Sequence, residues 1–164
     1  MKTAVCSGSF DPITLGHLDV IRRAARSFDR VYVCVSPNGE KKNQMFTPEQ
    51  KLALVKLAVE ELPNVEAELS GGLLAEYAAE KKATIVRGVR NVTDYDVEVQ
   101  LARINQELRP EVDTMLLPAS PAYQHFSSSM IREMIRYHQP LEKYLPAAIL
   151  PLLENMLAEN DRCL

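Results

Sequence analysis

The fold of this 164-residue chain is constrained most by the alternation of short apolar runs with longer segments of helical periodicity. The apolar runs predict five strands, at Thr3–Cys6, Arg30–Val35, Asn64–Leu69, Ala83–Arg87 and Val112–Leu117. The segments between them predict helices at Gly16–Ser27, Pro48–Glu61, Leu73–Lys82 and Asp94–Leu108. Because parallel strands need a crossover helix to return the chain, this order indicates an α/β fold. We expect a Rossmann-like single domain with a five-stranded parallel sheet flanked by helices.

Helix signals refine this outline. Thr47 can cap the second helix, Pro48 suits its first position, and Gln50 completes a T-x-x-Q capping box. The fourth helix carries Val97, Leu101, Ile104 and Leu108 on one face. After the fifth strand, further helices are predicted from Ser127 to about Tyr137 and from about Pro146 to Ala158, where they would cover the end of the sheet.

Composition narrows the class of protein. With 46% hydrophobic and 25% charged residues, and with no internal repeat or linker, we expect residues 1–164 to form one domain. No apolar run approaches the roughly 18 residues of a membrane span, and MKTAVCSGSF lacks a signal-peptide core, so we expect a cytoplasmic protein without membrane contact. Three cysteines without a C-x-x-C pair argue against a zinc site or disulfide framework. The net charge of -3 favours no nucleic-acid partner.

Ligands of parallel sheets bind beyond the carboxyl ends of the strands, so the residues after each strand are informative. The first strand is followed by SGSFDPITLGH, in which Gly8 permits close backbone approach and Pro12 stiffens the turn. Gly16 and His17 lie in the first turn of the next helix, whose N–H groups favour an anion such as phosphate. The alternative is a tight strand-to-helix turn with His17 as a polar residue near the cap.

Two further strand ends carry cations. The second strand is followed by SPNGEKKNQMF, in which Lys41 or Lys42 could reach a phosphate, although a solvated surface loop is the alternative. The fourth strand is followed by RGVRN, and two guanidinium groups at such an edge suggest an anion. The alternative is that Arg87 and Arg90 pair with nearby carboxylates, namely Asp94, Asp96 or Glu98.

The fifth strand is followed by YQHFSSSMIRE, in which three serines begin a helix and offer hydroxyls and backbone N–H groups. This is a second candidate phosphate cradle, because a plain cap needs only one serine. His125 could contact a ligand or be incidental, and His138 near a helix end could complement the helix dipole.

Taken together, GSFDPITLGH, the Lys41-Lys42 loop, RGVRN and FSSSMIRE resemble bacterial phosphopantetheine adenylyltransferases, nucleotidyltransferases marked by (H/T)-x-G-H, here Thr14 to His17. The resemblance runs in order from the first strand to about Pro146. It implies transfer of AMP from ATP to 4'-phosphopantetheine, with Mg2+ as cofactor, a homohexamer, and feedback by coenzyme A. Cys6-Ser7 replaces the common Tyr-Pro, and Asp96-Val97 replaces a frequent Glu-Tyr.

The resemblance also implies roles for individual residues. It makes His17 and Lys41 catalytic, with Lys42 an open alternative to Lys41. It assigns contacts to the acceptor substrate to Ser9, Lys41, Leu74 and Arg87. It assigns ATP contacts to Ser9, Phe10, His17, Gly88, Val89, Arg90, Glu98, Tyr123, Gln124, His125, Phe126, Ser127, Ser128 and Ser129. It implies no metal ligand from the protein.

Two rival functions remain open on the sequence. The first keeps the superfamily but changes the acceptor, as in adenylyl or cytidylyl transfer to nicotinamide mononucleotide or glycerol phosphate; RG-x-R and SSS-x-I-R favour phosphopantetheine. The second is a non-catalytic nucleotide-binding module, which could lose His17 or Lys41. Both residues are present.

Overall fold

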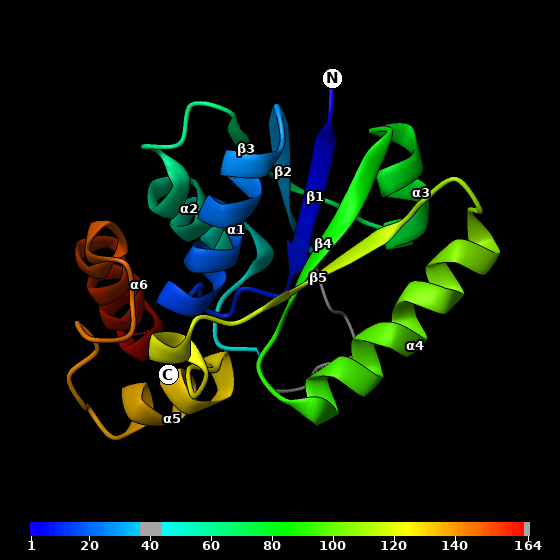
Figure 1. Cartoon of the computed structure of the whole chain (residues 1–164). Helices are drawn as coiled ribbons and strands as arrows, with labels where there is room; N and C mark the ends of the chain where they lie inside the picture. Colours follow the sequence, from blue (N-terminus) through cyan, green and yellow to red (C-terminus); the bar gives the residue numbers. More distant parts are fainter. Residues whose placement is uncertain (37–43, 163–164) are drawn as a thin grey trace.

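The computed structural model describes residues 1–36 and 44–162 and contains one sheet of five parallel strands in the order β3-β2-β1-β4-β5 (Figure 1). The strands are β1 (Thr3–Gly8), β2 (Arg30–Val35), β3 (Val65–Leu69), β4 (Ala83–Val89) and β5 (Thr114–Pro118). From β1 the chain builds outward to β3 and then crosses back to place β4 beside β1. This reversal puts a switch point between β1 and β4, where ligands of such sheets bind. The predicted α/β class and parallel sheet are confirmed.

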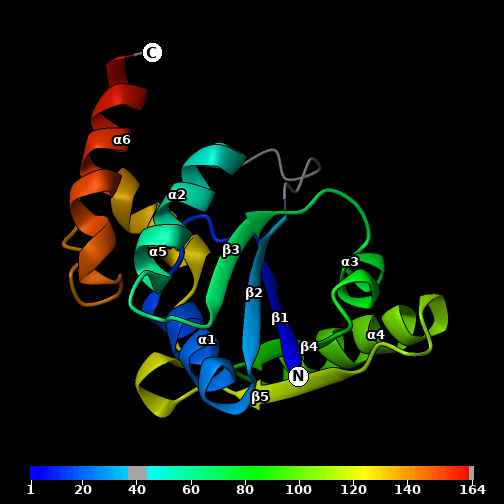
Figure 2. The same ribbon diagram turned by 90° about the horizontal axis from the view of Figure 1, so that it is seen from above.

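Helices cover both faces of this sheet. They are α1 (Leu15–Ser27), α2 (Pro48–Val59), α3 (Leu74–Glu80), α4 (Val92–Leu108), α5 (Ser128–Arg136) and α6 (Leu150–Arg162), with short 3-10 turns η1 (Pro121–Tyr123) and η2 (Ala147–Ile149). The two views show α1 and α2 on one face, and α3 and α4 on the other (Figures 1 and 2). None of the described helices is long and apolar enough to span a lipid bilayer.

Most predicted boundaries hold to within a few residues, and the differences have local causes. The capping box of α2 is confirmed, because the Gln50 N–H donates to Thr47 Oγ1 at 3.2 Å and the Thr47 N–H donates to Gln50 Oε1 at 3.0 Å. Strands β1 and β4 run two residues further than predicted. Glycine often marks a turn, but Gly8, the last residue of β1, and Gly88, the last but one of β4, both pair with neighbouring strands.

The core is unequal on the two faces. The larger cluster lies under α1, α2 and α6 and includes Ile21, Val33 and Leu54, which are at most 1% exposed. On the opposite face the buried residues form two small clusters, around Val5 and around Ile85. The side of the sheet that carries α1 is therefore the more deeply packed.

Helix α4 stands apart, because none of its 17 residues is buried. Its half-buried residues include Asp94, Glu98, Ala102 and Asn105, which recur at helical spacing and mark its inner face. The predicted apolar face lies beside this inner face and is about half exposed. We call this the α4 stripe, and its four residues, Val97, Leu101, Ile104 and Leu108, are between 43% and 51% exposed.

Candidate active site

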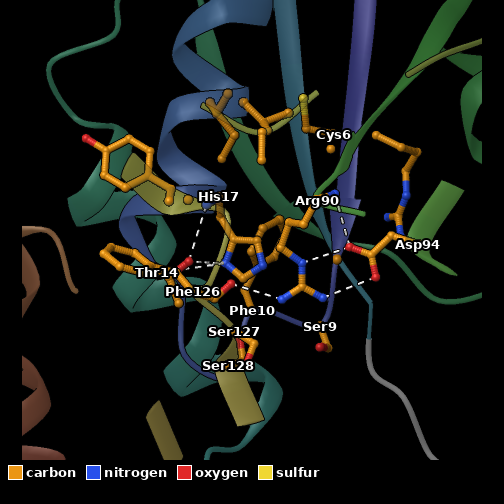
Figure 3. A pocket seen from close by; sticks show the side chains of 18 of the residues that line it. Cys6, Ser9, Phe10, Thr14, His17, Arg90, Asp94, Phe126, Ser127 and Ser128 are labelled. Atoms are coloured by element: carbon orange, nitrogen blue, oxygen red, sulfur yellow. Dashed lines mark hydrogen bonds and ion pairs between the residues drawn. The ribbon is translucent and has the colours of Figure 1, made fainter. Parts of the chain in front are cut away.

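A cavity of about 320 Å³ opens at the carboxyl edge of the sheet, at the switch point between β1 and β4 (Figure 3). Its walls come from the β1–α1 loop, the end of β4, the first turns of α4, and the segment from residue 119 to the start of α5. His17, Arg87 and Ser129, far apart in the sequence, all line it. Three of the four chain segments predicted to form the site, those after β1, β4 and β5, therefore meet at this edge. Most of the fourth, after β2, lies outside the described residues.

The β1–α1 loop is shaped by Phe10, which is 3% exposed and has a left-handed backbone with φ of 43°. Its ring packs edge-on against the ring of His17, with the centroids 5.2 Å apart. A Cβ on Gly8 would lie 3.1 Å from the Phe10 ring, closer than ordinary contact. Gly8 thus lets Phe10 support His17 from the side of the strand.

His17 is held in one protonation form. The backbone N–H of Thr14 donates to His17 Nδ1 at 3.0 Å, and the His17 N–H donates to Thr14 Oγ1 at 3.3 Å. Because a backbone N–H can only donate, Nδ1 is an acceptor and the neutral ring carries its proton on Nε2. Burial, with Arg87 and Arg90 nearby, lowers the pKa of His17 to about 4. At neutral pH the residue is an uncharged donor.

Arg87 is clamped on two sides. Its Nε donates to Glu98 Oε2 at 2.9 Å and its Nη2 donates to Glu98 Oε1 at 2.7 Å. Its Nη1 donates to Ser7 Oγ at 2.9 Å and also to the Ser7 carbonyl. The carboxylate pairing considered for Arg87 is therefore present. The side chain lines the cavity all the same, and the clamp fixes its orientation.

Arg90 is tied to α4 and to the loop before α5. Its Nε donates to Asp94 Oδ2 at 2.8 Å, and its Nη1 donates to the Phe126 carbonyl at 3.0 Å (Figure 3). The hydrogen bond from Arg90 lowers the pKa of Asp94. Both arginines thus line the cavity as oriented cations, each held by a carboxylate of α4.

The three serines at the start of α5 have different partners. Ser127 caps the helix, with its Oγ accepting from the Met130 N–H at 3.1 Å. Ser128 Oγ donates to the Pro12 carbonyl at 2.9 Å, and Ser129 Oγ accepts from Arg132 Nη2 at 3.1 Å. The backbone N–H groups of the first turn lack intrahelical partners. The helix terminus therefore offers an anion site whose place against the β1–α1 loop is fixed.

The cavity holds few groups suited to other chemistry. The Cys6 thiol lines it, but burial raises its pKa to about 12 despite the influence of Arg87, so it is not a thiolate at neutral pH. Within residues 1–36 and 44–162, no three His, Cys, Asp or Glu side chains are grouped as a metal site requires. Oriented cations, a neutral imidazole donor and a helix N-terminus are what binding several phosphate groups needs.

Comparison with known proteins agrees with this chemistry. A family model described as cytidylyltransferase-like matches residues 5–134. A phosphopantetheine adenylyltransferase from Alkaliphilus metalliredigens is 40% identical over 151 residues, covering 92% of this chain and 96% of that protein. The chain belongs to the phosphopantetheine adenylyltransferase family.

Two further similarities bear on this family. A phosphopantetheine adenylyltransferase from Levilactobacillus brevis is 41% identical over 150 residues, covering 91% of this chain and 92% of that protein. A solved structure from Vibrio parahaemolyticus, described as a candidate nicotinate-nucleotide adenylyltransferase, has a TM-score of 0.69 at 22% identity, covering 94% of this chain and 93% of that one. The latter likeness concerns the fold.

Most residues that the family resemblance implicates lie at the cavity. Its lining includes Ser9, Phe10, His17, Arg87, Gly88, Arg90, Glu98, Tyr123, Phe126, Ser127, Ser128 and Ser129. Four described residues are not among the lining set, namely Leu74, Val89, Gln124 and His125. The His125 ring packs edge-on against Phe126, and the Leu74 side chain packs against the cluster around Val5. Lys41 and Lys42 lie outside the described residues.

The lining residues that sequence reasoning missed include three polar or charged ones, Thr14, Asp94 and Arg132. Thr14 and Arg132 fall inside motifs quoted for the family, so the motif itself was the available signal. The sequence indicates Asp94 only as a carboxylate partner for an arginine, and in the structure it pairs with Arg90. Asp11 was also missed: it belongs to the β1–α1 loop and is 3% exposed.

Proposed function

We propose that this chain transfers the adenylyl group of ATP to 4'-phosphopantetheine, giving dephospho-coenzyme A and pyrophosphate in coenzyme A biosynthesis. The relatives that share about 40% identity over nine-tenths of the chain bear the name of this activity. The observation that carries the proposal is the meeting of His17, Arg87 and the start of α5 at one cavity. Such a site suits a reaction between two phosphate-bearing substrates.

The proposed reaction forms a bond between an oxygen of the acceptor phosphate and the α-phosphorus of ATP. The bond from that phosphorus to the oxygen bridging to the β-phosphate breaks, and its electron pair leaves with pyrophosphate. An acceptor phosphate has a second pKa of about 6, so it is already an oxyanion at neutral pH and needs no general base. Catalysis then rests on positioning and on stabilising negative charge.

The geometry suggests how the residues divide this work. His17 donates from Nε2 to the α-phosphate, a role that its fixed tautomer supports. Ser128, Ser129 and the N-terminus of α5 bind the β- and γ-phosphates, with Arg90 supporting the triphosphate. Arg87, clamped by Glu98 and Ser7, binds the acceptor phosphate.

Lys41 is proposed as a second contact to the reacting phosphates, on the family resemblance alone. Replacing Lys41 and Lys42 separately by Ala tests this, with initial rates compared at saturating ATP and acceptor. The larger loss identifies the reactive lysine. Equal mild losses would mean that both lysines are ordinary solvated side chains.

Magnesium is proposed to enter with ATP. Among the described residues no cluster fits an all-protein Mg2+ site, and Mg2+ in nucleotide sites is held largely by phosphate oxygens and water. When bound, the ion would neutralise phosphate charge. We assign no protein ligand to it. Measuring turnover after chelation and on adding back Mg2+ tests the requirement.

The acceptor is tested by incubating the protein with ATP and each candidate, and measuring pyrophosphate release. We expect release with 4'-phosphopantetheine and formation of dephospho-coenzyme A. Release with nicotinamide mononucleotide or glycerol phosphate instead would identify a different transferase, an alternative that the cytidylyltransferase-like match keeps relevant. ATP binding without release under any condition would indicate a non-catalytic nucleotide-binding module.

Self-association is proposed from the α4 stripe. Four large apolar side chains, 43–51% exposed on one helix face, form an apolar surface that another copy of this chain would cover. The family resemblance implies a homohexamer. Its mass would be about 110 kDa, six times the 18.4 kDa chain. Light scattering coupled to size exclusion measures it.

Feedback by coenzyme A is proposed on the same resemblance. Coenzyme A contains the adenylyl and pantetheine parts of the proposed product, so it would compete for the same cavity. We expect its inhibition to be relieved by raising the concentrations of both substrates. Inhibition that substrates do not relieve would indicate a separate binding site. The cytoplasmic location expected from the sequence stays a prediction.

A further inference from the structure

A buried carboxylate lies directly behind a cavity built for anions. Asp11 follows Phe10 in the β1–α1 loop and is 3% exposed. It is not among the residues that line the cavity, so it is placed to act on the protein rather than on a substrate. Burying a charge is unfavourable unless the charge is paired and hydrogen-bonded. The partners of Asp11 therefore indicate what it is for.

One set of partners belongs to the segment entering α2. The Met45 N–H donates to Asp11 Oδ2 at 3.0 Å, and the Phe46 N–H donates to Oδ1 at 3.0 Å. Lys51 in α2, whose side chain is fully buried, places Nζ 4.0 Å from Oδ1 and donates to Gln44 Oε1 at 2.7 Å. Two consecutive N–H groups on one carboxylate fix both its position and its orientation. The β1–α1 loop is thus locked to α2.

The other partner belongs to α5. Arg132 Nη1 donates to the Asp11 carbonyl at 2.8 Å and lies 3.6 Å from Asp11 Oδ2. The same guanidinium donates through Nη2 to Ser129 Oγ at 3.1 Å. Arg132 and Ser129 both line the cavity. Asp11 therefore lies behind a cation and a hydroxyl that face the ligand.

We propose that Asp11 is a positioning residue that aims the Arg132 guanidinium, and with it Ser129, at the phosphates of the bound nucleotide. The inference rests on the proposed function, because it assumes a nucleotide in the cavity. Its physical basis is preorganisation: a cation already oriented needs no rearrangement as charge moves onto the departing pyrophosphate. The hydrogen bonds from Met45 and Phe46 fix the Asp11 carboxylate, so the Arg132 guanidinium beside it is also held in one orientation.

A double-mutant cycle on Asp11→Asn and Arg132→Ala tests the proposal. The measured quantities are kcat, KM for ATP and KM for the acceptor, at a temperature where circular dichroism shows every variant folded. Each single variant is expected to lose on the order of a hundredfold in kcat/KM for ATP, the scale of misplacing a catalytic contact. The double variant is expected to be no slower than Arg132→Ala. KM for the acceptor, assigned to Arg87, stays within about twofold.

A matched control is Asp19→Asn. Asp19 also accepts hydrogen bonds within the fold, from Ser120 Oγ at 2.7 Å and Arg23 Nη1 at 3.4 Å, but it is not among the cavity-lining residues. Its replacement leaves kcat and both KM values within about twofold. Losses that multiply in the Asp11 and Arg132 double variant overturn the proposal, as does an Asp11→Asn enzyme that is less stable yet kinetically unchanged.

Arg132→Lys tests the same idea if Asp11→Asn does not fold. Lysine keeps the charge but cannot donate to both Asp11 and Ser129 in the forked geometry. It is expected to recover less than about a tenth of the lost kcat/KM, whereas near-complete rescue would mean that only the charge matters.

Calorimetry of inorganic pyrophosphate binding tests the positioning role without requiring turnover. Asp11→Asn should weaken pyrophosphate binding about tenfold. Unchanged binding contradicts positioning, while absent product with every acceptor contradicts the proposed function instead.

Discussion

Helices α1 and α4 follow the adjacent strands β1 and β4 and each contribute to a wall of one cavity, yet they are anchored very differently. Helix α1 carries His17 and buries Leu18, Ile21 and Ala24 in the larger core cluster. Helix α4 carries Glu98, the partner of Arg87, and has no buried residue. The contrast teaches that one wall is fixed by the packing of a single chain, whereas the other rests on a helix whose apolar stripe is exposed.

The largest effect is expected on the α1 wall. Replacing His17 by Ala should lower turnover at least about a hundredfold, the scale of losing one preorganised donor, while fold and ATP affinity stay nearly intact. The reason is that α1 is held by its own core contacts and does not need the imidazole to fold. Steady-state kinetics, with ATP affinity from calorimetry, measure both parts.

His138→Ala is the matched control, since His138 follows α5 and is not a cavity residue. It should change turnover less than twofold. Near-normal turnover in His17→Ala would refute the assigned role. A large loss of ATP affinity would show instead that His17 supports ground-state binding.

A somewhat smaller effect is expected at Arg87, which Glu98 of α4 holds in place. Arg87→Met should raise KM for the acceptor about 10- to 100-fold, because hydrogen bonds to charged groups contribute roughly 1.5–3 kcal/mol. Arg103→Met, on the exposed surface of α4, is the control and should leave KM unchanged. If Arg87→Met changed KM for ATP but not for the acceptor, the division of the cavity between the two substrates would be reversed.

The exposed stripe of α4 leads to a third prediction. Changing Leu101 and Ile104 together to Glu should dissociate the proposed assembly and lower activity by about tenfold, because Glu98 and Asp94 orient the arginines from the same helix. Light scattering and kinetics on the same sample report both effects. Gln106→Glu adds charge to the same helix, on the side away from the stripe, and should alter neither. A hexamer that survives the double change would place the interface elsewhere.

The sequence predicted the scaffold better than the links between its parts. Strand β2 and the Thr47 capping box follow from local residue preferences, so they were predictable within a few positions. The link from Asp11 to Arg132 joins residues 121 positions apart, which no local pattern encodes. The pairing of Arg87 with Glu98 was foreseen as an alternative, because the two lie only 11 positions apart.

The α4 stripe shows a second limit. Periodicity identifies an apolar face but not what it packs against, and the inner face of α4 is set by Asp94 and Glu98 reaching the arginines. The polar pairs thus determine the rotation of the helix, and the apolar residues are left outside. Within the site, the motifs located the cavity-lining loops. Lys41 lies outside the described residues, so its proposed role stays a prediction.

The smallest effect on turnover is expected from pH. His17 of α1 and Asp94 of α4 affect stability in different pH ranges, so pH distinguishes the two walls. His17 has a pKa near 4 in the fold and about 6.5 when unfolded, so below pH 6.5 the unfolded chain binds the extra proton and stability falls as pH falls. The hydrogen bond from Arg90 lowers the pKa of Asp94, so the contribution of Asp94 to stability is present above about pH 3.8 and is lost only below it.

Urea unfolding from pH 7 to 5 should therefore show a loss of about 1–2 kcal/mol in the free energy of unfolding of the wild type. His17→Gln should remove this loss, and Asp94→Asn should retain it. Since His17 stays neutral throughout this range, turnover per folded molecule should vary through the acceptor phosphate, whose pKa is about 6, and not through the enzyme. A drop in stability that persists in His17→Gln would show that another group takes up the proton, and would contradict the low pKa assigned to His17.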